Sequence, residues 1–359
     1  MTTLHSGHRE HGRSACTAVE AIQRLVGIVS EDQQIEQLVW SPIATYARDT
    51  PIDVIWHLEK KLDDWKTSHL HLIPELDTDT ALNTLLVYRW QGMPMPPSPY
   101  TSTTRHSSVA AVHFNFYIAR VKWALSLLGH DPQQTQLIAE FYFYEALRHA
   151  ASLVSRLAVA SELEDRYIPC EAVNIGILPV LHIIGLCSPQ PSWLEWIKNS
   201  CDRITQEGVL KGHTFATNLN CLHMFEERMK GASLSIADYY PKPAERIICH
   251  LVPERSGRHF TSYFAIPLLG RDTNYEGLST YRLIGNARWE CGYGENPCTP
   301  VIKIYDEENV LSRSFSMDWL YSTQIVQDWV SWSEVKEFRM DRALQDHISG
   351  TRLLLAAND

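Results

Sequence analysis

The sequence predicts a mainly α protein, a multi-helix bundle with a central apolar helical hairpin and an irregular, partly extended C-terminal insertion. Apolar residues recur at helical spacing from residue 15 to about residue 231, and no internal repeat or low-complexity tract interrupts them. Two long segments, 106–128 and 133–157, have apolar side chains around most of their circumference, as buried helices do. Beyond residue 239, short β-like pieces alternate with Gly, Pro, Asn and Asp.

The helices before the hairpin have recognisable start signals. Residues 30–33, Ser-Glu-Asp-Gln, fit a capping box. Thr50 and Pro51 precede a segment whose apolar side chains recur at i, i+3, i+7 and i+10, which predicts one buried helix face. These apolar residues are Ile55, Leu58, Leu62 and Trp65. Residues 92–104, rich in Pro, Ser and Thr, predict an exposed loop that leads into the hairpin.

Further helices are expected after the hairpin. The apolar run 172–187 predicts a buried helix, since it falls short of the ~20 residues that span a bilayer. A capping box at residues 192–195 begins with Ser192 and opens a helix that stops at Gly208. The remaining expected helices cover 214–230, 317–335 and 341–355, and the expected extended pieces cover 260–269, 281–289 and 301–305.

These elements predict a single mainly helical domain over 15–355. Within it, the irregular excursion covers about 239–316. Residues 1–14 are expected to form a disordered arm without the apolar core of a secretory signal, and 356–359 a short tail. We expect no membrane partner and a location in the nucleus or the cytoplasm.

The composition argues against direct binding of nucleic acid. Of the 359 residues, 45% are hydrophobic, and 32 Lys+Arg against 42 Asp+Glu give a net charge of −10. Phosphate backbones require a clustered basic surface, which this balance does not favour. The eleven tryptophans are spread through helical faces and are not interleaved with Lys and Arg, as stacking platforms for single strands would be.

Standard catalytic and metal-binding signatures are absent from the sequence. It contains no G-x-S-x-G, Walker loop, complete G-x-G-x-x-G or H-E-x-x-H. Cys291 and Cys298 flank a turn-rich stretch, but no second pair lies nearby to complete a metal site. His69 and His71 lie in a predicted loop. We therefore expect no metal and no cofactor.

Polar residues on the apolar hairpin are the best candidates for a site. They form one stripe on each helix, and stripes that faced each other would line a pocket suited to a small polar molecule. The candidate ligand-binding residues are Tyr117, Arg120, Tyr144 and Arg148. The candidate acid and base groups of an enzyme are His113, Glu145 and His149. Alternatively, Glu145 pairs with Arg148 or His149 along one helix, and His113 is a hydrogen-bonded core residue.

Several segments, taken in their order along the chain, indicate a family resemblance. They are residues 58–65, 73–76, 113–123, 177–181, 189–197, 281–289, 304–307 and 344–354. Together they resemble the regulatory region of fungal Zn2Cys6 zinc-cluster transcription factors, the fungal-specific transcription factor domain. The family reads DNA through C-x2-C-x6-C repeats that hold two zinc ions, whereas this sequence has no C-x2-C anywhere.

The resemblance implies a regulator without its own zinc cluster. It would act in a fungal secondary-metabolite gene cluster, through a partner protein or by sensing a small-molecule metabolite, and it could form a homodimer. The alternative is a cofactor-independent enzyme of secondary metabolism, an isomerase, cyclase or dehydratase on the same helical fold. Such chemistry can run on substrate positioning with one acid and one base.

Overall fold

The computed structural model confirms the predicted fold class. It describes residues 6–40, 50–73, 95–101, 104–160, 176–187, 191–204, 206–207, 210–232, 247–253, 259–267, 281–290, 300–304 and 336–339. This part of the chain is mainly helical, with a small antiparallel sheet. It forms two compact units, Met1–Gly212 and His213–Asp359. Separate units arise because helices and sheet each bury an apolar face within their own unit.

The first unit contains helices and one short β ribbon. The helices are α1 (Ser6–Ser30), α2 (Gln33–Trp40), α4 (Ile52–Ser68), α6 (Arg105–Leu127), α7 (Pro132–Ala160), α8 (Leu178–Cys187) and α9 (Pro191–Arg203). The ribbon pairs β1 (Gln206–Glu207) with β2 (Leu210–Lys211) in antiparallel fashion. Within the described residues, no helix is both long enough and apolar enough to cross a bilayer.

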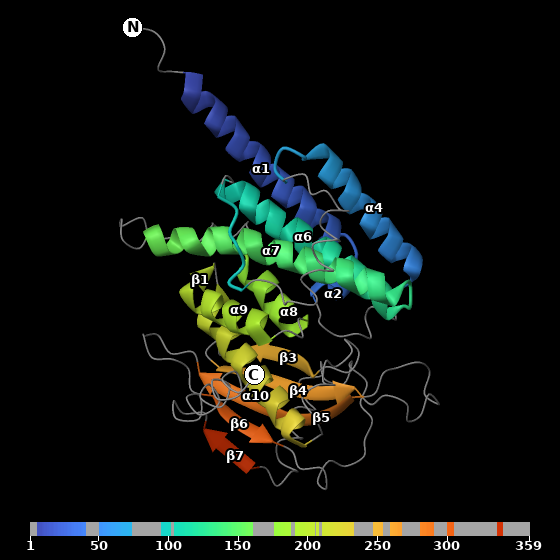
Figure 1. The fold of residues 1–359 in the computed structure, drawn as a ribbon, viewed down its shortest axis with the longest axis vertical. Coiled ribbons are helices and arrows are strands. Elements are labelled where there is room, and N and C mark those ends of the chain that lie inside the picture. The colour runs from blue at the N-terminus through green and yellow to red at the C-terminus, as the bar shows by residue number, and fades with distance from the viewer. Residues whose placement is uncertain are drawn as a thin grey trace. The chain divides into compact units, whose positions relative to one another are not determined.

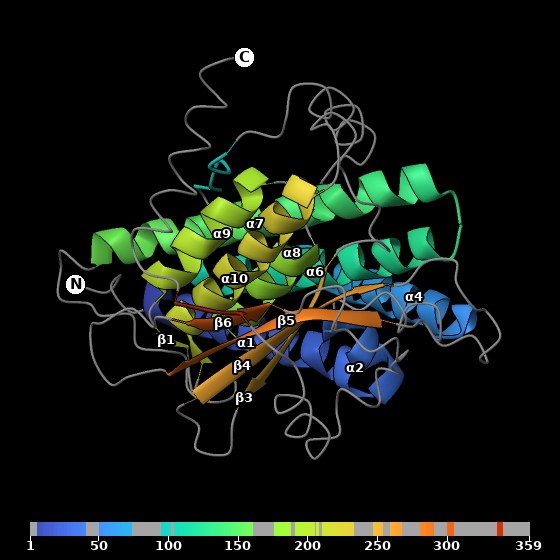
Figure 2. The same ribbon diagram turned by 90° about the horizontal axis from the view of Figure 1, so that it is seen from below.

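Helix α6 is the centre of the first unit. It contacts α1, α2, α4, α7 and α8, and every residue from 110 to 121 is buried. Burial on all sides explains why the segment lacks a polar face. Helices α6 and α7 run side by side (Figure 1 and Figure 2) and form the predicted hairpin. The chain reverses at Gly129, whose φ of 82° lies in the left-handed region that glycine adopts without steric cost.

Helix α4 confirms the predicted amphipathic face. Its four predicted apolar residues are all buried. The indole of Trp65 also donates a hydrogen bond to the Ala21 carbonyl at 2.9 Å, which ties α4 to α1. On the more polar side, Glu59 forms an ion pair with Lys122 of α6. Pro51 precedes the first helical residue, Ile52, instead of occupying the first helical position.

The predicted boundaries of α1 and α9 are wrong. Helix α1 begins at Ser6, within the stretch predicted as a disordered arm, because no proline interrupts residues 6–14 and extending an existing helix costs little per residue. Helix α9 begins at Pro191, so Ser192 lies inside it and not at its cap, and it ends at Arg203 before Gly208.

Helix α2 is capped by Asp32 and not by the predicted Ser30. The Asp32 carboxylate accepts a hydrogen bond from the Gln34 backbone N–H at 2.7 Å. Ser30 is the last residue of α1. A two-residue turn therefore separates the helices, and only Asp32 is placed to receive the free N–H groups of α2.

The second unit pairs a helix with a five-stranded sheet. The helix α10 (Gly212–Ala232) is two residues longer at each end than the expected 214–230. The strands are β3 (Ile248–Pro253), β4 (His259–Pro267), β5 (Tyr281–Glu290), β6 (Val301–Ile304) and β7 (Lys336–Arg339). All neighbouring strands are antiparallel and follow chain order across the sheet (Figure 1).

The sheet contains the extended pieces of the predicted C-terminal insertion. Its second, third and fourth strands match the three extended pieces that the sequence indicated, whereas β3 and β7 were not predicted. The expected helices over 317–335 and 341–355, and the tail over 356–359, lie outside the described residues.

Helix α10 packs on this sheet through aromatic and polar contacts. The ring of Phe225 stacks on that of Phe264, with centroids 4.4 Å apart. The buried Asn218 side-chain oxygen accepts hydrogen bonds from the Ser262 hydroxyl and, at 3.1 Å, from the Cys249 thiol. These contacts fix the helix to β3 and β4 and satisfy polar groups inside the unit.

Candidate functional site

All seven predicted site residues lie on the central hairpin, but their contacts divide them among separate neighbourhoods. On α6 they are His113, Tyr117 and Arg120, and on α7 they are Tyr144, Glu145, Arg148 and His149. All are buried except Arg148, whose side chain is 28% exposed.

Arg120 closes the C-terminal end of α2. Its buried guanidinium donates from Nε to the Val39 carbonyl at 3.1 Å and from Nη2 to the Leu38 carbonyl at 2.8 Å. Its Nη1 donates to Cys187 Sγ of α8 at 3.1 Å, and its Cζ lies 4.2 Å from the Trp123 ring centroid. A cation suits this position because the last carbonyls of a helix carry the negative end of its dipole.

These contacts favour a structural role for Arg120 over the predicted ligand-binding role. All three guanidinium nitrogens are engaged with protein groups on α2 and α8. Burial lowers the pKa of Arg120, while the neighbouring Cys187 raises it. A ligand would have to displace contacts that hold three helices together, so we assign Arg120 to packing.

His113 and Tyr117 belong to an aromatic cluster around Trp40. The Trp40 ring centroid lies 6.5 Å from that of His113, 5.3 Å from that of Phe116 and 5.8 Å from that of Tyr117. Burial raises the pKa of Tyr117, and its hydroxyl has no hydrogen-bond partner in the part of the chain that is described. Tyr117 therefore keeps hydrogen-bonding capacity toward a buried ligand or water.

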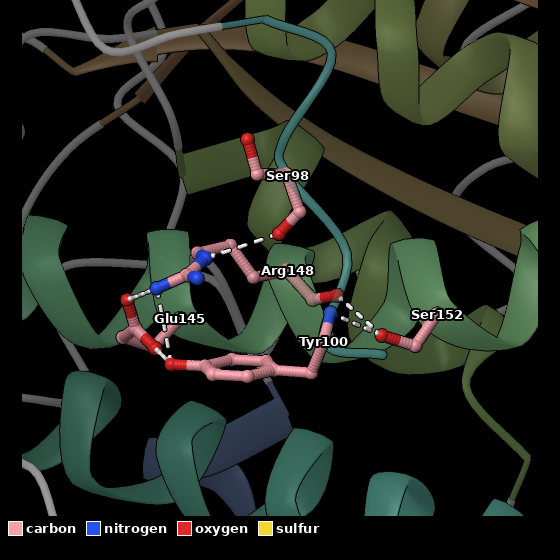
Figure 3. A network of polar contacts seen from close by, with 5 residues as sticks. All are labelled: Ser98, Tyr100, Glu145, Arg148 and Ser152. Atoms are coloured by element: carbon pink, nitrogen blue, oxygen red, sulfur yellow. Dashed lines mark hydrogen bonds and ion pairs between the residues drawn. The ribbon is translucent and has the colours of Figure 1, made fainter. Parts of the chain in front are cut away.

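Glu145 and Arg148 hold Tyr100 against α7 (Figure 3). Tyr100 belongs to residues 95–101, which we call the strap. Its hydroxyl donates to Glu145 Oε2 at 2.5 Å, and Arg148 Nη1 donates to both Glu145 Oε1 and the Tyr100 hydroxyl at 3.0 Å. Arg148 Nε donates to the Ser98 carbonyl at 3.1 Å, and the guanidinium carbon lies 4.1 Å from the Tyr100 ring centroid.

The local sequence of α7 explains why these groups meet. Glu145, Arg148, His149 and Ser152 are spaced i, i+3, i+4 and i+7, which places them on one face of the helix. Ser152 Oγ accepts a hydrogen bond from the Tyr100 backbone N–H at 2.7 Å. The strap is thus fixed by its backbone and by one side chain.

The carboxylate of Glu145 is engaged with neighbouring protein groups. Both of its oxygens accept hydrogen bonds, and it forms the ion pair with Arg148 that the sequence offered as an alternative to catalysis. Burial and the charge of Glu145 raise the pKa of Tyr100, so the phenol retains its proton. Partial burial lowers the pKa of Arg148, but the negative charge of Glu145 and its hydrogen bond to Arg148 raise that pKa overall. The network is well suited to positioning and poorly suited to proton transfer.

His149 lies beside this network as a buried neutral ring. It is 1% exposed, and its ring stacks on that of Tyr100 with centroids 4.3 Å apart and planes 19° apart. Burial and the charge of Arg148 lower the pKa of His149 to about 3. A base with such a pKa holds protons weakly at neutral pH, which argues against a role as general base.

Tyr144 faces a different neighbour. Its ring centroid lies 5.8 Å from that of Trp193 in α9, and both side chains are buried. The residue therefore contributes to the packing of α7 against α9.

The roles of Tyr100 and Ser98 were not predicted from the sequence. Residues 92–104 were expected to form an exposed loop, whereas Pro97 is buried and Tyr100 is half-buried. One sequence feature could have indicated this contact: an aromatic residue directly follows Pro-Ser-Pro. Prolines hold the backbone extended, which favours a fixed course of the chain along a helix.

No metal site is described in this structure. Among the residues that it describes, no group of three or more His, Cys, Asp or Glu side chains is placed to hold a metal ion. His69 stacks on Trp65 with centroids 4.8 Å apart, and its Nδ1 lies 2.8 Å from the Trp65 carbonyl. Cys291 and Cys298 fall outside the described residues.

Comparison with family models, with curated proteins and with solved structures finds no match for this chain. The resemblance to fungal zinc-cluster regulators therefore rests on the ordered sequence segments alone.

Proposed function

We propose that this chain is a transcription-regulator-like protein of a fungal secondary-metabolite gene cluster. It acts through a partner protein or by sensing a small molecule, and these 359 residues contain no zinc cluster with which to read DNA. Such a regulator works in the nucleus, and another protein supplies the contact with the promoter. The ordered segments that resemble fungal regulators support this assignment.

The proposal draws its main structural support from the internal engagement of the predicted acid and base groups. Glu145 is occupied by Tyr100 and Arg148, His149 is buried with a pKa of about 3, and His113 lies among aromatic rings. Groups held in this way stabilise a helical body, whereas an acid–base enzyme needs them within reach of a substrate.

Deletion of the gene in its native host tests the proposal. Transcripts of neighbouring genes and the metabolite profile are measured in the same culture. We expect the neighbouring transcripts to fall together by several-fold, with loss of the final product. Level transcripts with accumulation of one intermediate would instead identify an enzyme, and that intermediate would be its first candidate substrate.

Re-expression of single variants in the deletion strain distinguishes the effect of a lower protein level from the effect of a lost catalytic group. His149→Gln removes the imidazole that an enzyme would use, and Arg24→Gln on an exposed position of α1 serves as the control. We expect transcript levels to follow the amount of protein on an immunoblot in both strains. Loss of product by His149→Gln at normal protein and transcript levels would contradict the proposal.

A further inference from the structure

Ser98 lies exposed on the strap between two anchored residues. Pro97 before it is buried, and Tyr100 after it is hydrogen-bonded to α7. Pro99 follows directly and restricts Ser98 to extended backbone conformations. The Ser98 hydroxyl points away from the polar network (Figure 3). The residue is thus an accessible hydroxyl on an extended segment, the form in which protein kinases bind their substrates.

The flanking prolines indicate which class of kinase fits. Mitogen-activated protein kinases act on Ser or Thr with proline at the next position and commonly at two positions before. Pro99 and Pro96 occupy those positions here. Thr50 is also followed by a proline, but it is only 5% exposed. Three further sites of this type, at Ser41, Ser188 and Thr299, lie outside the described residues.

Arg148 provides a counter-charge beside Ser98. Its Nε already donates to the Ser98 carbonyl, and its Nη1 serves Glu145 and Tyr100. In the described part of the chain, Nη2 makes no hydrogen bond, so two N–H donors of a charged, partly exposed guanidinium remain available. Rotation of the exposed Ser98 side chain is fast and can bring a phosphate on Oγ toward these donors.

We propose that Ser98 is a phosphorylation site for a proline-directed kinase and that Arg148 binds the resulting phosphate. Ser98 Oγ attacks the γ-phosphorus of ATP, and an Oγ–P bond forms as the bond from that phosphorus to the bridging oxygen of ADP breaks. The hydroxyl proton passes to the kinase's catalytic base, and ADP leaves. The phosphate adds a charge of about −1.5 to −2 and pairs with the guanidinium, which fastens the strap to α7. This proposal does not depend on the regulator function.

Phosphorylation of the purified full chain tests the acceptor site. The folded protein is incubated with an active mitogen-activated protein kinase, Mg²⁺ and ATP, and the sites are mapped by mass spectrometry. We expect phosphate on Ser98, its loss in Ser98→Ala, and an initial rate at least about tenfold lower in Pro99→Ala, with Thr50 unmodified. If Ser98 is modified only after denaturation, or not at all, the acceptor site is refuted.

The role of Arg148 is tested by ³¹P NMR titration of the phosphorylated protein. A guanidinium partner favours the doubly charged phosphate, so we expect its second pKa to lie below the ordinary value of about 6 and to return to it in urea. Arg148→Gln should raise it by about 0.5 or more. Equal values in the native wild type, in the variant and in urea would refute the pairing. If Arg148→Gln does not fold, judged by circular dichroism, then the native and urea values of the wild type decide.

Discussion

Arg120 offers the sharpest test at the scale of single residues. Arg120→Met leaves the Leu38 and Val39 carbonyls without their charged donor inside the core. A buried acceptor that loses its partner costs its full desolvation, so we expect the free energy of unfolding to fall by about 2–4 kcal/mol. Urea denaturation measures the change. Arg24→Met, at an exposed position, should change it by less than about 0.5 kcal/mol. Equal effects would argue that Arg120 does not cap α2.

The pKa of His149 predicts a pH dependence of stability. Its folded-state pKa of about 3 lies below the ordinary value of 6.5, so the unfolded chain binds more protons between these pH values. The contribution of His149 to the free energy of unfolding is therefore fully present above pH 6.5. It falls by up to about 1.4 kcal/mol per pH unit as the pH drops toward 3.

The control for this dependence is a variant without the imidazole. Urea midpoints at pH 7, 6, 5 and 4 should fall less steeply in His149→Gln than in the wild type. Some dependence should persist in the variant, because burial also lowers the pKa of His182 to about 3. Parallel curves for the two proteins would show that His149 is protonated as easily when folded as when unfolded.

At the scale of elements, the start of α2 distinguishes the observed cap from the predicted one. Asp32→Ala removes the acceptor of the Gln34 N–H and should lower the free energy of unfolding by about 1 kcal/mol. Ser30→Ala, at the exposed end of α1, should change it by less than about 0.5 kcal/mol. Urea midpoints of the two variants give the comparison, and a larger effect of Ser30→Ala would restore the capping box that the sequence suggested.

The elements differ in how much of them the sequence could predict. The long helices α6 and α7 were predictable because apolar side chains recur around most of their circumference over more than twenty residues. The four-residue β7 was not, since so short a strand is fixed by its pairing with β6, which brings Lys303 opposite Glu337. The contact between Tyr100 and Glu145 spans 45 residues and depends on how the strap is laid on α7, which periodicity does not encode.

At the scale of the whole molecule, the division into two units makes a prediction about folding. The first unit, Met1–Gly212, contains α6 together with the helices that cover it. Because the helices of this unit bury α6, we expect the fragment 1–212 to fold alone. It should retain helical circular dichroism and unfold in urea in one cooperative transition.

A shorter fragment provides the matched control for that prediction. Fragment 1–160 ends after α7 and lacks α8 and α9, so Arg120 loses its contact with Cys187 and Tyr144 loses Trp193. Exposed apolar faces on α6 and α7 should then give a broad urea transition, dye binding and aggregation, as in compact states without fixed packing. If fragment 1–212 itself lacks fixed packing, the first unit depends on the second for its stability, and the prediction is wrong. Cooperative folding of both fragments would instead place the stable core within the hairpin and the helices before it.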